Sequence, residues 1–251
     1  MSKKIIYITG AGVSEKSGIP TFRGKDGFWT IGSKNYTPQQ MATRQMYLER
    51  PDEFLLWYFR RFVSYENLKP NLVHYWLSKK DLVTQNIDGL DEKAGNSTYI
   101  PIHGQIDKVT TFNDQNLTTP LINAPWDEVK NNCSDFDDNL TLKKTLLNAF
   151  KISKLTLRPE KNISLKPFVL LFDEYYTELY KISKVQELFQ QADHMIFMGT
   201  SFSVNITNIA LDIAIYKDAI IEVVNPDHID LKIDNVIYHR MKAHEYVMEN
   251  I

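Results

Sequence analysis

The side chain best suited to acid–base chemistry in this 251-residue sequence is His103. It follows the apolar residue Ile102 and precedes Gly104, and an imidazole with a pKa near neutrality can remove the proton of a hydroxyl group. We therefore predict His103 as a general base. The other five histidines are expected to pack or to lie at the surface or at strand ends: His74, His194, His228, His239 and His244.

A glycine-rich turn stands near the start of the chain, in the sequence Gly10-Ala11-Gly12-Val13-Ser14. Glycines directly after a strand let the backbone approach a pyrophosphate closely, and the free N–H groups of a following helix attract its negative charge. The usual fingerprint for this function has a third glycine at the position of Glu15. The motif alone therefore leaves an ordinary strand-to-helix turn as an alternative.

Small polar residues follow three more apolar runs. They are Thr84-Gln85-Asn86-Ile87-Asp88-Gly89-Leu90, then Gly199-Thr200-Ser201, and finally Asn225-Pro226. The carboxyl ends of parallel strands line the crevice in which α/β sheets bind ligands, so we expect these tips and the glycine turn to share one cleft. Asparagine and aspartate can also stand in a turn only to satisfy their own backbone, and that alternative stays open.

Four short apolar runs must position these residues, and they predict buried strands over residues 5–9, 81–84, 194–198 and 220–224. Their continuous rather than alternating apolarity favours a parallel sheet covered on both faces. Apolar residues at helical spacing predict helices over residues 51–68, 179–191 and 208–216. The sequence thus predicts a doubly wound, Rossmann-like α/β fold.

Two segments differ from this pattern: a helical insertion at residues 34–75 and a small lobe at residues 105–165. The Rossmann-like domain is predicted from the rest, residues 1–33, 76–104 and 166–251. Within the lobe we expect a helix over residues 140–150. Its apolar core is predicted to contain Phe112, Leu117, Trp126, Phe136, Leu142, Leu146 and Phe150.

Composition excludes several classes of protein. The sequence is 43% hydrophobic and 24% charged, as in globular proteins, and its net charge of −2 provides no cationic field for a nucleic acid. The single cysteine, Cys133, excludes an internal disulfide, and neither a targeting segment nor a membrane-spanning run is evident. We predict a cytoplasmic protein with neither a nucleic-acid nor a membrane partner; the oligomeric state stays open.

The ordered set of motifs resembles the sirtuins, the NAD-dependent protein deacylases. The matching stretches are Gly10-Ala11-Gly12-x-Ser14, Gly18-Ile19-Pro20-x-Phe22-Arg23, residues 84–90 with Ala94-Gly95, His103-Gly104, residues 165–174 in part, Gly199-Thr200-Ser201 and Ile221-x-Val223-x-Asn225. They occur in the family's order along the chain, apart from residues 105–165. The resemblance implies NAD as the cofactor and an acyl-lysine protein or peptide as the substrate.

The resemblance also implies roles for individual residues. His103 and Asn86 would be catalytic. The residues implied to bind NAD are Gly10, Ala11, Gly12, Ser14, Phe22, Arg23, Gln85, Asn86, Asp88, Gly199, Thr200, Ser201 and Asn225. The substrate loop, residues 165–174, would pair with an extended acyl-lysine peptide through Leu170, Leu171, Phe172 and Asp173. Asp173 stands where the family usually has glycine.

The implied reaction transfers the acyl group to ADP-ribose and releases nicotinamide. Three alternatives keep the NAD cleft or the sheet: an NAD glycohydrolase or ADP-ribosyltransferase, a catalytically idle NAD-sensing module, and a dehydrogenase. Some sirtuins that remove acidic acyl groups carry tyrosine and arginine three residues apart, as Tyr58 and Arg61 are here. If the Arg60-Arg61 pair instead anchors the alignment, Trp57 and Arg60 take these places and the phenol is lost. Both arginines could also simply be solvated on an amphipathic helix.

Sirtuins commonly hold four zinc-binding cysteines between the histidine motif and the substrate loop. Here residues 105–165 contain one cysteine and no histidine, so the usual sulfur and imidazole ligands are missing. We expect no metal site in this lobe and far less than one equivalent of zinc in the purified protein.

Overall fold

The computed structural model describes residues 3–20 and 36–251; the predicted NAD contacts Phe22 and Arg23 lie outside the described residues. The chain divides into two compact units. Unit 1 comprises Met1–Thr21, Leu68–His103 and Tyr180–Ile251, and unit 2 comprises Phe22–Asn67 and Gly104–Leu179.

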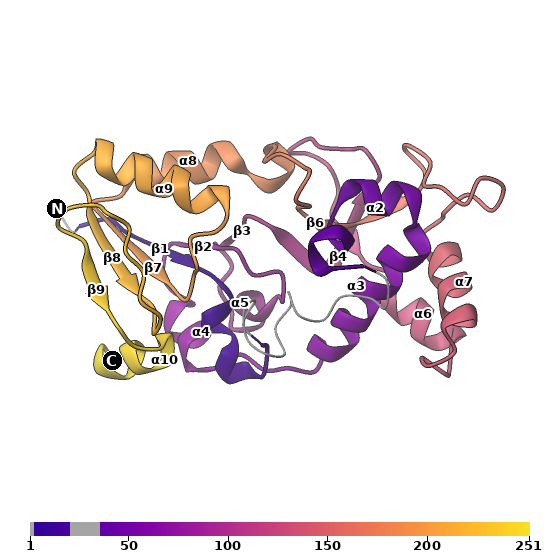
Figure 1. Ribbon diagram of the computed structural model, residues 1–251, viewed down its shortest axis with the longest axis horizontal. Helices are drawn as coiled ribbons and strands as arrows, with labels where there is room; N and C mark the ends of the chain where they lie inside the picture. Colours follow the sequence, from indigo (N-terminus) through magenta and orange to yellow (C-terminus); the bar gives the residue numbers. More distant parts are fainter. Residues whose placement is uncertain (1–2, 21–35) are drawn as a thin grey trace. The chain divides into compact units, whose positions relative to one another are not determined.

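Unit 1 is built on six parallel strands in the order β3-β2-β1-β7-β8-β9 (Figure 1). The strands are β1 (Ile5–Thr9), β2 (Leu82–Thr84), β3 (Ile100–Pro101), β7 (His194–Met198), β8 (Ile220–Val224) and β9 (Ile237–His239). The strand order reverses between β1 and β7. In doubly wound folds the ligand crevice lies outside the carboxyl ends of the two strands at such a reversal.

Helices cover both faces of this sheet. In Figure 1, α8 (Ile182–Gln191) and α9 (Asn205–Tyr216) lie on one side, and α4 (Leu72–Leu77) and α10 (Ala243–Glu249) lie on the other. Short elements follow the first two strands: η1 (Ala11–Val13), η2 (Glu15–Ser17) and α5 (Leu90–Lys93). The predicted doubly wound α/β fold is confirmed, since β1, β7 and β8 have the predicted bounds and β2 begins one residue later than predicted.

Unit 2 combines a small antiparallel sheet with helices. Its strands, in the order β5-β4-β6, are β4 (Gly104–Thr111), β5 (Ile122–Asn123) and β6 (Leu165–Val169). Its helices are α1 (Pro38–Met41), α2 (Arg44–Glu49), α3 (Pro51–Tyr65), α6 (Trp126–Asn132) and α7 (Asn139–Ala149). α3 begins with Pro51 in its first turn, followed by Asp52 and Glu53, which favour the positive end of the helix dipole.

The structure shows why the residue after His103, at the start of β4, is a glycine. Gly104 has a φ of 89°, a conformation that side chains rarely adopt, and a Cβ atom there would overlap the carbonyl oxygen of Phe168 on β6. The glycine is therefore required for strand pairing.

An aromatic cluster around Trp126 holds the lobe. The Trp126 side chain is 1% exposed, its indole N–H donates to the backbone oxygen of Ile106 at 2.8 Å, and its ring contacts Phe59, Phe62 and Phe150. The predicted helix at residues 140–150 is α7. Most of the predicted core residues are buried or, like Phe136, packed on the cluster, but the prediction for Leu117 is wrong, because its side chain is 62% exposed. Leu117 lies in the loop between β4 and β5, not on a helix or strand that faces the core.

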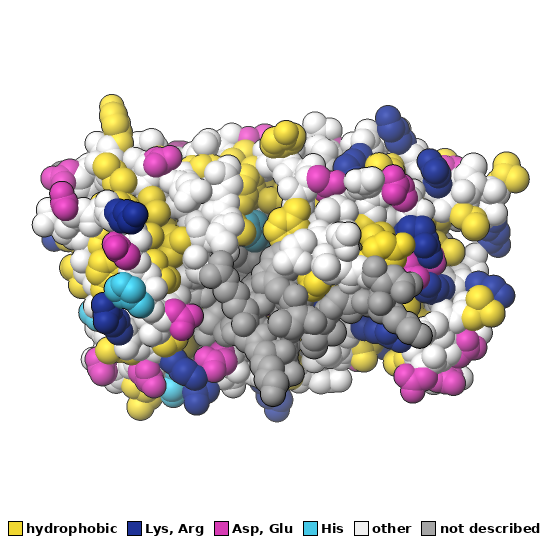
Figure 2. Space-filling view, viewed as in Figure 1, with side chains coloured by type: hydrophobic (Ala, Val, Ile, Leu, Met, Phe, Trp, Pro, Cys, Tyr) yellow, Lys and Arg dark blue, Asp and Glu magenta, His cyan; other side chains and the backbone are white. Residues whose placement is uncertain are grey.

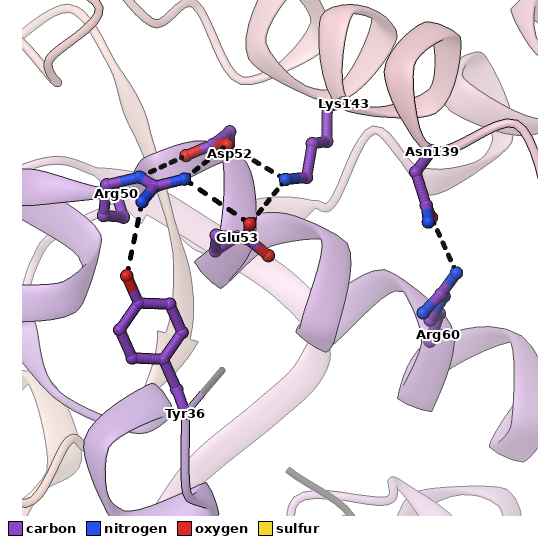
Figure 3. Close-up of polar contacts among 7 residues, drawn as sticks. All are labelled: Tyr36, Arg50, Asp52, Glu53, Arg60, Asn139 and Lys143. Carbon is purple, nitrogen blue, oxygen red and sulfur yellow. Dashed lines mark hydrogen bonds and ion pairs between the residues drawn. The ribbon is translucent and has the colours of Figure 1, made fainter. Parts of the chain in front are cut away.

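Ion pairs and a hydrogen bond also join α7 to α3 (Figure 3). The ammonium group of Lys143 lies 3.1 Å from a carboxylate oxygen of Asp52 and 2.6 Å from one of Glu53. Arg60 on α3 donates to the side-chain oxygen of Asn139 at 2.8 Å. Among residues 3–20 and 36–251, no group of three or more His, Cys, Asp or Glu side chains is placed to hold a metal ion.

Charged side chains of both signs are interspersed on the face drawn in Figure 2. Within the described part of the chain, every helix is too short or too polar to cross a membrane.

Candidate functional site

The glycine turns after β1 and β7 meet backbone to backbone. The N–H of Gly12 donates to the carbonyl oxygen of Gly199 at 3.0 Å, and the N–H of Gly10 donates to that of Met198 at 3.1 Å. A Cβ atom on Gly10 would lie 2.9 Å from the Gly199 oxygen, and one on Gly12 would lie 2.7 Å from the Gly199 Cα. Only glycine allows this close approach at the point where the strand order reverses.

Three predicted site residues form one hydrogen-bonded group beside the first turn. Asn86 donates from its side-chain amide to the Gly10 carbonyl at 3.2 Å and to the Ser14 hydroxyl at 3.1 Å. Ser14 in turn donates to a carboxylate oxygen of Asp88 at 2.7 Å. Burial raises the pKa of Asp88, although the hydrogen bonds from the Leu90 amide and from Ser14 oppose this rise. The β2 tip and the β1 turn are thus joined through side chains.

His74, which was expected only to pack, extends this group. It is fully buried on α4, and its Nδ1 accepts the N–H of Asn71, so the neutral ring carries its proton on Nε2. Nε2 lies 3.3 Å from the Ser14 hydroxyl. Burial lowers the pKa of His74 to about 4, which keeps the ring neutral. Hydrogen bonds therefore run in one direction, from His74 through Ser14 to Asp88.

A weak sequence signal for this contact exists. Asn71 and His74 have the three-residue spacing of a helix capping box, and the structure contains that capping box at the start of α4. The spacing predicts the helix start but says nothing of Ser14, which lies 60 residues earlier in the chain.

His103 lies just after the carboxyl end of β3, and a backbone carbonyl holds its ring. Its Nδ1 is 3.1 Å from the backbone oxygen of Gln85, and because a carbonyl can only accept, Nδ1 carries the proton of the neutral ring. Nε2 then carries the lone pair. Burial lowers the pKa of His103 to about 4, and the Gln85 carbonyl only partly opposes this. At neutral pH the imidazole is therefore a proton acceptor at Nε2.

The tips of β2, β7 and β8 are connected in the same way. The Gln85 side-chain amide donates to the Thr200 hydroxyl at 3.1 Å, and the Asn225 amide donates to the Thr200 carbonyl at 2.8 Å. Ser201 is exposed and pairs with Ser203 at 2.7 Å. Ala11 lies in η1, where its carbonyl accepts the N–H of Ser14. The structure thus joins Gln85, Thr200 and Asn225, whereas Ser201 points to its own loop.

The predicted substrate residues belong to unit 2. Leu170, Leu171, Phe172 and Asp173 follow β6; Leu171 is buried, and Phe172 is 54% exposed. The Asp173 carboxylate accepts backbone N–H groups at the start of α2.

The predicted pair Tyr58 and Arg61 lies on α3, and both side chains are buried, at 1% and 8% exposure. The Arg61 guanidinium carbon lies 3.3 Å from the centroid of the Trp57 ring, and the guanidinium donates to the Trp57 carbonyl at 3.1 Å. Burial raises the pKa of Tyr58 and lowers that of Arg61 to about 10. Arg60 of the alternative pair is exposed. Recognition of an acidic acyl group remains a prediction.

Comparison with known proteins places this geometry in context. A family model described as the Sir2 family matches residues 10–206. The chain is 29% identical over 259 residues to NAD-dependent protein deacylase 1 of Caldanaerobacter subterraneus subsp. tengcongensis, covering 99% of this chain and 93% of that protein. It is 31% identical over 210 residues to the NAD-dependent protein deacylase of Thermococcus sibiricus, covering 81% and 72%.

Solved structures agree with the sequence comparison. A Sir2 homologue in complex with NAD superposes with a TM-score of 0.72 at 27% identity, over 99% of this chain and 88% of that chain. A histidine-to-asparagine mutant of a Sir2 homologue in complex with ADP-ribose gives the same TM-score at 26% identity, over 99% and 90%.

Proposed function

The chain belongs to the Sir2 family, and on that premise we propose that it is an NAD-dependent protein-lysine deacylase. It transfers the acyl group of an acyl-lysine to ADP-ribose and releases nicotinamide. The observation that carries the proposal is the state of His103: the Gln85 carbonyl fixes the neutral ring with its basic nitrogen at Nε2. We further propose that the protein is cytoplasmic and has neither a nucleic-acid nor a membrane partner.

The side chains at the switch point fit NAD as the cosubstrate. Ribose hydroxyls and a carboxamide need amide, hydroxyl and carboxylate partners, and Asn86, Asp88 and Gln85 offer these groups at the tip of β2. Thr200, Ser201 and Asn225 offer the same chemistry at the tips of β7 and β8 for the adenosine ribose. When bound, NAD supplies a nicotinamide leaving group and the ribose carbon and hydroxyls that take up the acyl group.

The glycine turn after β1 allows the backbone to lie close to the turn after β7. The N–H groups of Gly10 and Gly12 already donate to the carbonyl oxygens of Met198, the last residue of β7, and of Gly199, so these two amides are not available to phosphate oxygens. Both glycines instead keep the two turns within contact distance, and Ala11 lies between them. We propose that the pyrophosphate lies against this backbone surface, as in other doubly wound folds.

Asn86 and His103 carry the chemistry in this proposal. Asn86 is held by the Gly10 carbonyl and the Ser14 hydroxyl, which fix its amide to orient the nicotinamide-side ribose. His103 accepts a proton from a ribose hydroxyl at Nε2, so that the hydroxyl oxygen can attack the acyl carbon. The depressed pKa leaves the base unprotonated across the neutral range.

Analysis of the products tests this function. The protein is incubated with NAD and with acetyl-, succinyl- and long-chain acyl-lysine peptides, and the nucleotide products are identified by mass spectrometry. We expect acylated ADP-ribose, nicotinamide and deacylated peptide in equal amounts. Formation of ADP-ribose at the same rate without peptide would identify a glycohydrolase, and ADP-ribose attached to a protein would identify a transferase.

A further inference from the structure

The loop after β6, residues 170–174, contains this chain's departure from the family pattern at Asp173. The Asp173 carboxylate accepts two backbone N–H groups of α2: one oxygen lies 2.6 Å from the Arg44 nitrogen, and the other lies 3.0 Å from the Gln45 nitrogen. A carboxylate at the N-terminal end of a helix also interacts favourably with the helix dipole. Glycine, the usual family residue, could make neither contact.

The α2 helix needs this carboxylate for its first turn. Its own capping residue, Thr43, accepts only the third amide of the helix, that of Met46, at 3.0 Å. The first two amides, which a helix cannot satisfy internally, are those bonded to Asp173. The cap of α2 is therefore divided between a local hydroxyl and a carboxylate from a loop some 130 residues away.

The neighbouring residue, Glu174, reinforces the connection. One of its oxygens pairs with the Arg44 guanidinium at 3.1 Å, and the other pairs with the buried ammonium of Lys166 at 2.9 Å. Burial lowers the pKa of Lys166, and the charge of Glu174 opposes that shift. The Phe172 N–H also donates to the Ala42 carbonyl at 3.0 Å. Three consecutive loop residues thus bond to residues 42–45.

We propose that Asp173 is a positioning residue for the acylated peptide. By capping α2 it fixes residues 170–174 in one conformation before the peptide arrives, which lowers the entropy lost when an extended peptide pairs with this loop. The inference rests on the proposed deacylase function. It concerns the peptide, because every contact of Asp173 described above lies within unit 2, whereas the described residues proposed to bind NAD lie in unit 1.

Steady-state kinetics of Asp173→Ala and Asp173→Asn test the proposal. We expect Asp173→Ala to raise the KM for the acyl-lysine peptide about fivefold, since a helix cap contributes on the order of 1 kcal/mol, with the KM for NAD unchanged and kcat within about twofold. Asp173→Asn keeps one acceptor oxygen and should recover part of the affinity. Hydrogen exchange at residues 170–174 should accelerate in the alanine variant.

Asp138→Ala is the matched control. Asp138 is also an exposed aspartate of unit 2 that caps a helix, since it accepts the amides of Leu140 and Thr141 on α7 at 3.1 and 3.2 Å. It should leave both KM values unchanged. An unchanged peptide KM in Asp173→Ala, or a parallel rise in both KM values, overturns the inference while the deacylase function stands. If the wild-type protein deacylates no peptide, the proposed function fails and the inference fails with it.

Discussion

The strand tips of unit 1 and the lobe of unit 2 bury different kinds of side chains. In unit 1 the buried residues near the strand tips include Ser14, His74, Gln85 and Asn86, and each is hydrogen bonded to a partner from another part of the chain. In unit 2 the largest buried side chains are aromatic, with Trp126 at the centre of a ring cluster.

This difference predicts different consequences of substitution in the two regions. A buried polar group contributes little net stability even when it is hydrogen bonded, whereas a buried aromatic ring contributes several kcal/mol. The polar group in unit 1 is therefore best explained by what it orients, and the ring cluster in unit 2 by the lobe it holds. Variants in unit 1 should lose activity in a folded protein, and variants in the ring cluster should lose stability first.

His103→Ala should give the largest effect on the unit 1 side of this comparison. Removing the proton acceptor should lower kcat by about 10²–10⁴-fold, because general-base catalysis typically contributes that much. The melting temperature should change little. Steady-state deacylation and thermal unfolding of the same preparation check both statements.

The control for this variant is His228→Ala, which removes an exposed histidine from the same unit. It should retain wild-type turnover. Wild-type speed in a folded His103→Ala protein would show that His103 is not the base.

Trp126→Ala should give the largest effect in unit 2. It removes a ring that is 1% exposed and its hydrogen bond to Ile106, so the free energy of unfolding should fall by about 3–5 kcal/mol. Urea unfolding measures this change. Leu117→Ala, at a side chain of the same unit that is 62% exposed, should change it by less than about 0.5 kcal/mol. Equal losses in the two variants would contradict the assignment of the cluster as the core of the lobe.

The sequence predicts the central strands well because each is a continuous apolar run that ends in polar residues. The sequence does not predict β9, because the strand has only three residues and its apolar run, Val236-Ile237-Tyr238, is shorter than those of β1 and β7. β6 was missed as a strand of a small antiparallel sheet because it contains Pro167 and the buried Lys166, a residue type that usually indicates the surface. The ion pair that Lys166 forms with Glu174 is evident only from the structure.

The sequence predicts the residues of the candidate site where polar side chains directly follow strands. Gln85, Asn86, Thr200 and Asn225 were predicted from their place after apolar runs. The contact between His74 and Ser14 was not, since it joins residues 60 positions apart and depends on how α4 packs against the sheet. Sequence spacing reports local geometry, and long-range hydrogen bonds have no such signature.

Asp91→Asn tests whether the buried polar residues of unit 1 weaken the fold. Asp91 is 2% exposed, and among the described residues its Oδ1 has no hydrogen-bond partner. Burial raises the pKa of Asp91 to about 7, and the nearby charge of Asp88 adds to this rise. A raised carboxyl pKa means that the folded state holds the proton more tightly than the unfolded state does.

The stability from that proton is complete below about pH 4 and is lost as the pH rises to about 7. The loss amounts to about 4 kcal/mol at most, since each pKa unit corresponds to about 1.4 kcal/mol. Asp91→Asn should flatten this dependence and raise the melting temperature at pH 8. Asp227→Asn, at an exposed aspartate of the same unit, should leave it unchanged. A wild-type protein that is equally stable at pH 5 and pH 8 by thermal unfolding, with the same pH profile as Asp91→Asn, would mean that Asp91 ionises normally.

Lys143→Met should have the smallest effect, and it sharpens the account of unit 2. The Lys143 side chain is 21% exposed, and those of Asp52 and Glu53 are 25% and 15% exposed, so water and salt screen the ion pairs (Figure 3). Burial alone would lower the pKa of Lys143, but its hydrogen bonds to Glu53 and Asp52 raise it. We expect a loss of about 1 kcal/mol or less, which shrinks further in 1 M salt. Because methionine keeps the apolar stem of the side chain, urea unfolding at low and high salt isolates the charge. A loss as large as that of Trp126→Ala would mean that ion pairs, rather than aromatic rings, hold α7 to α3.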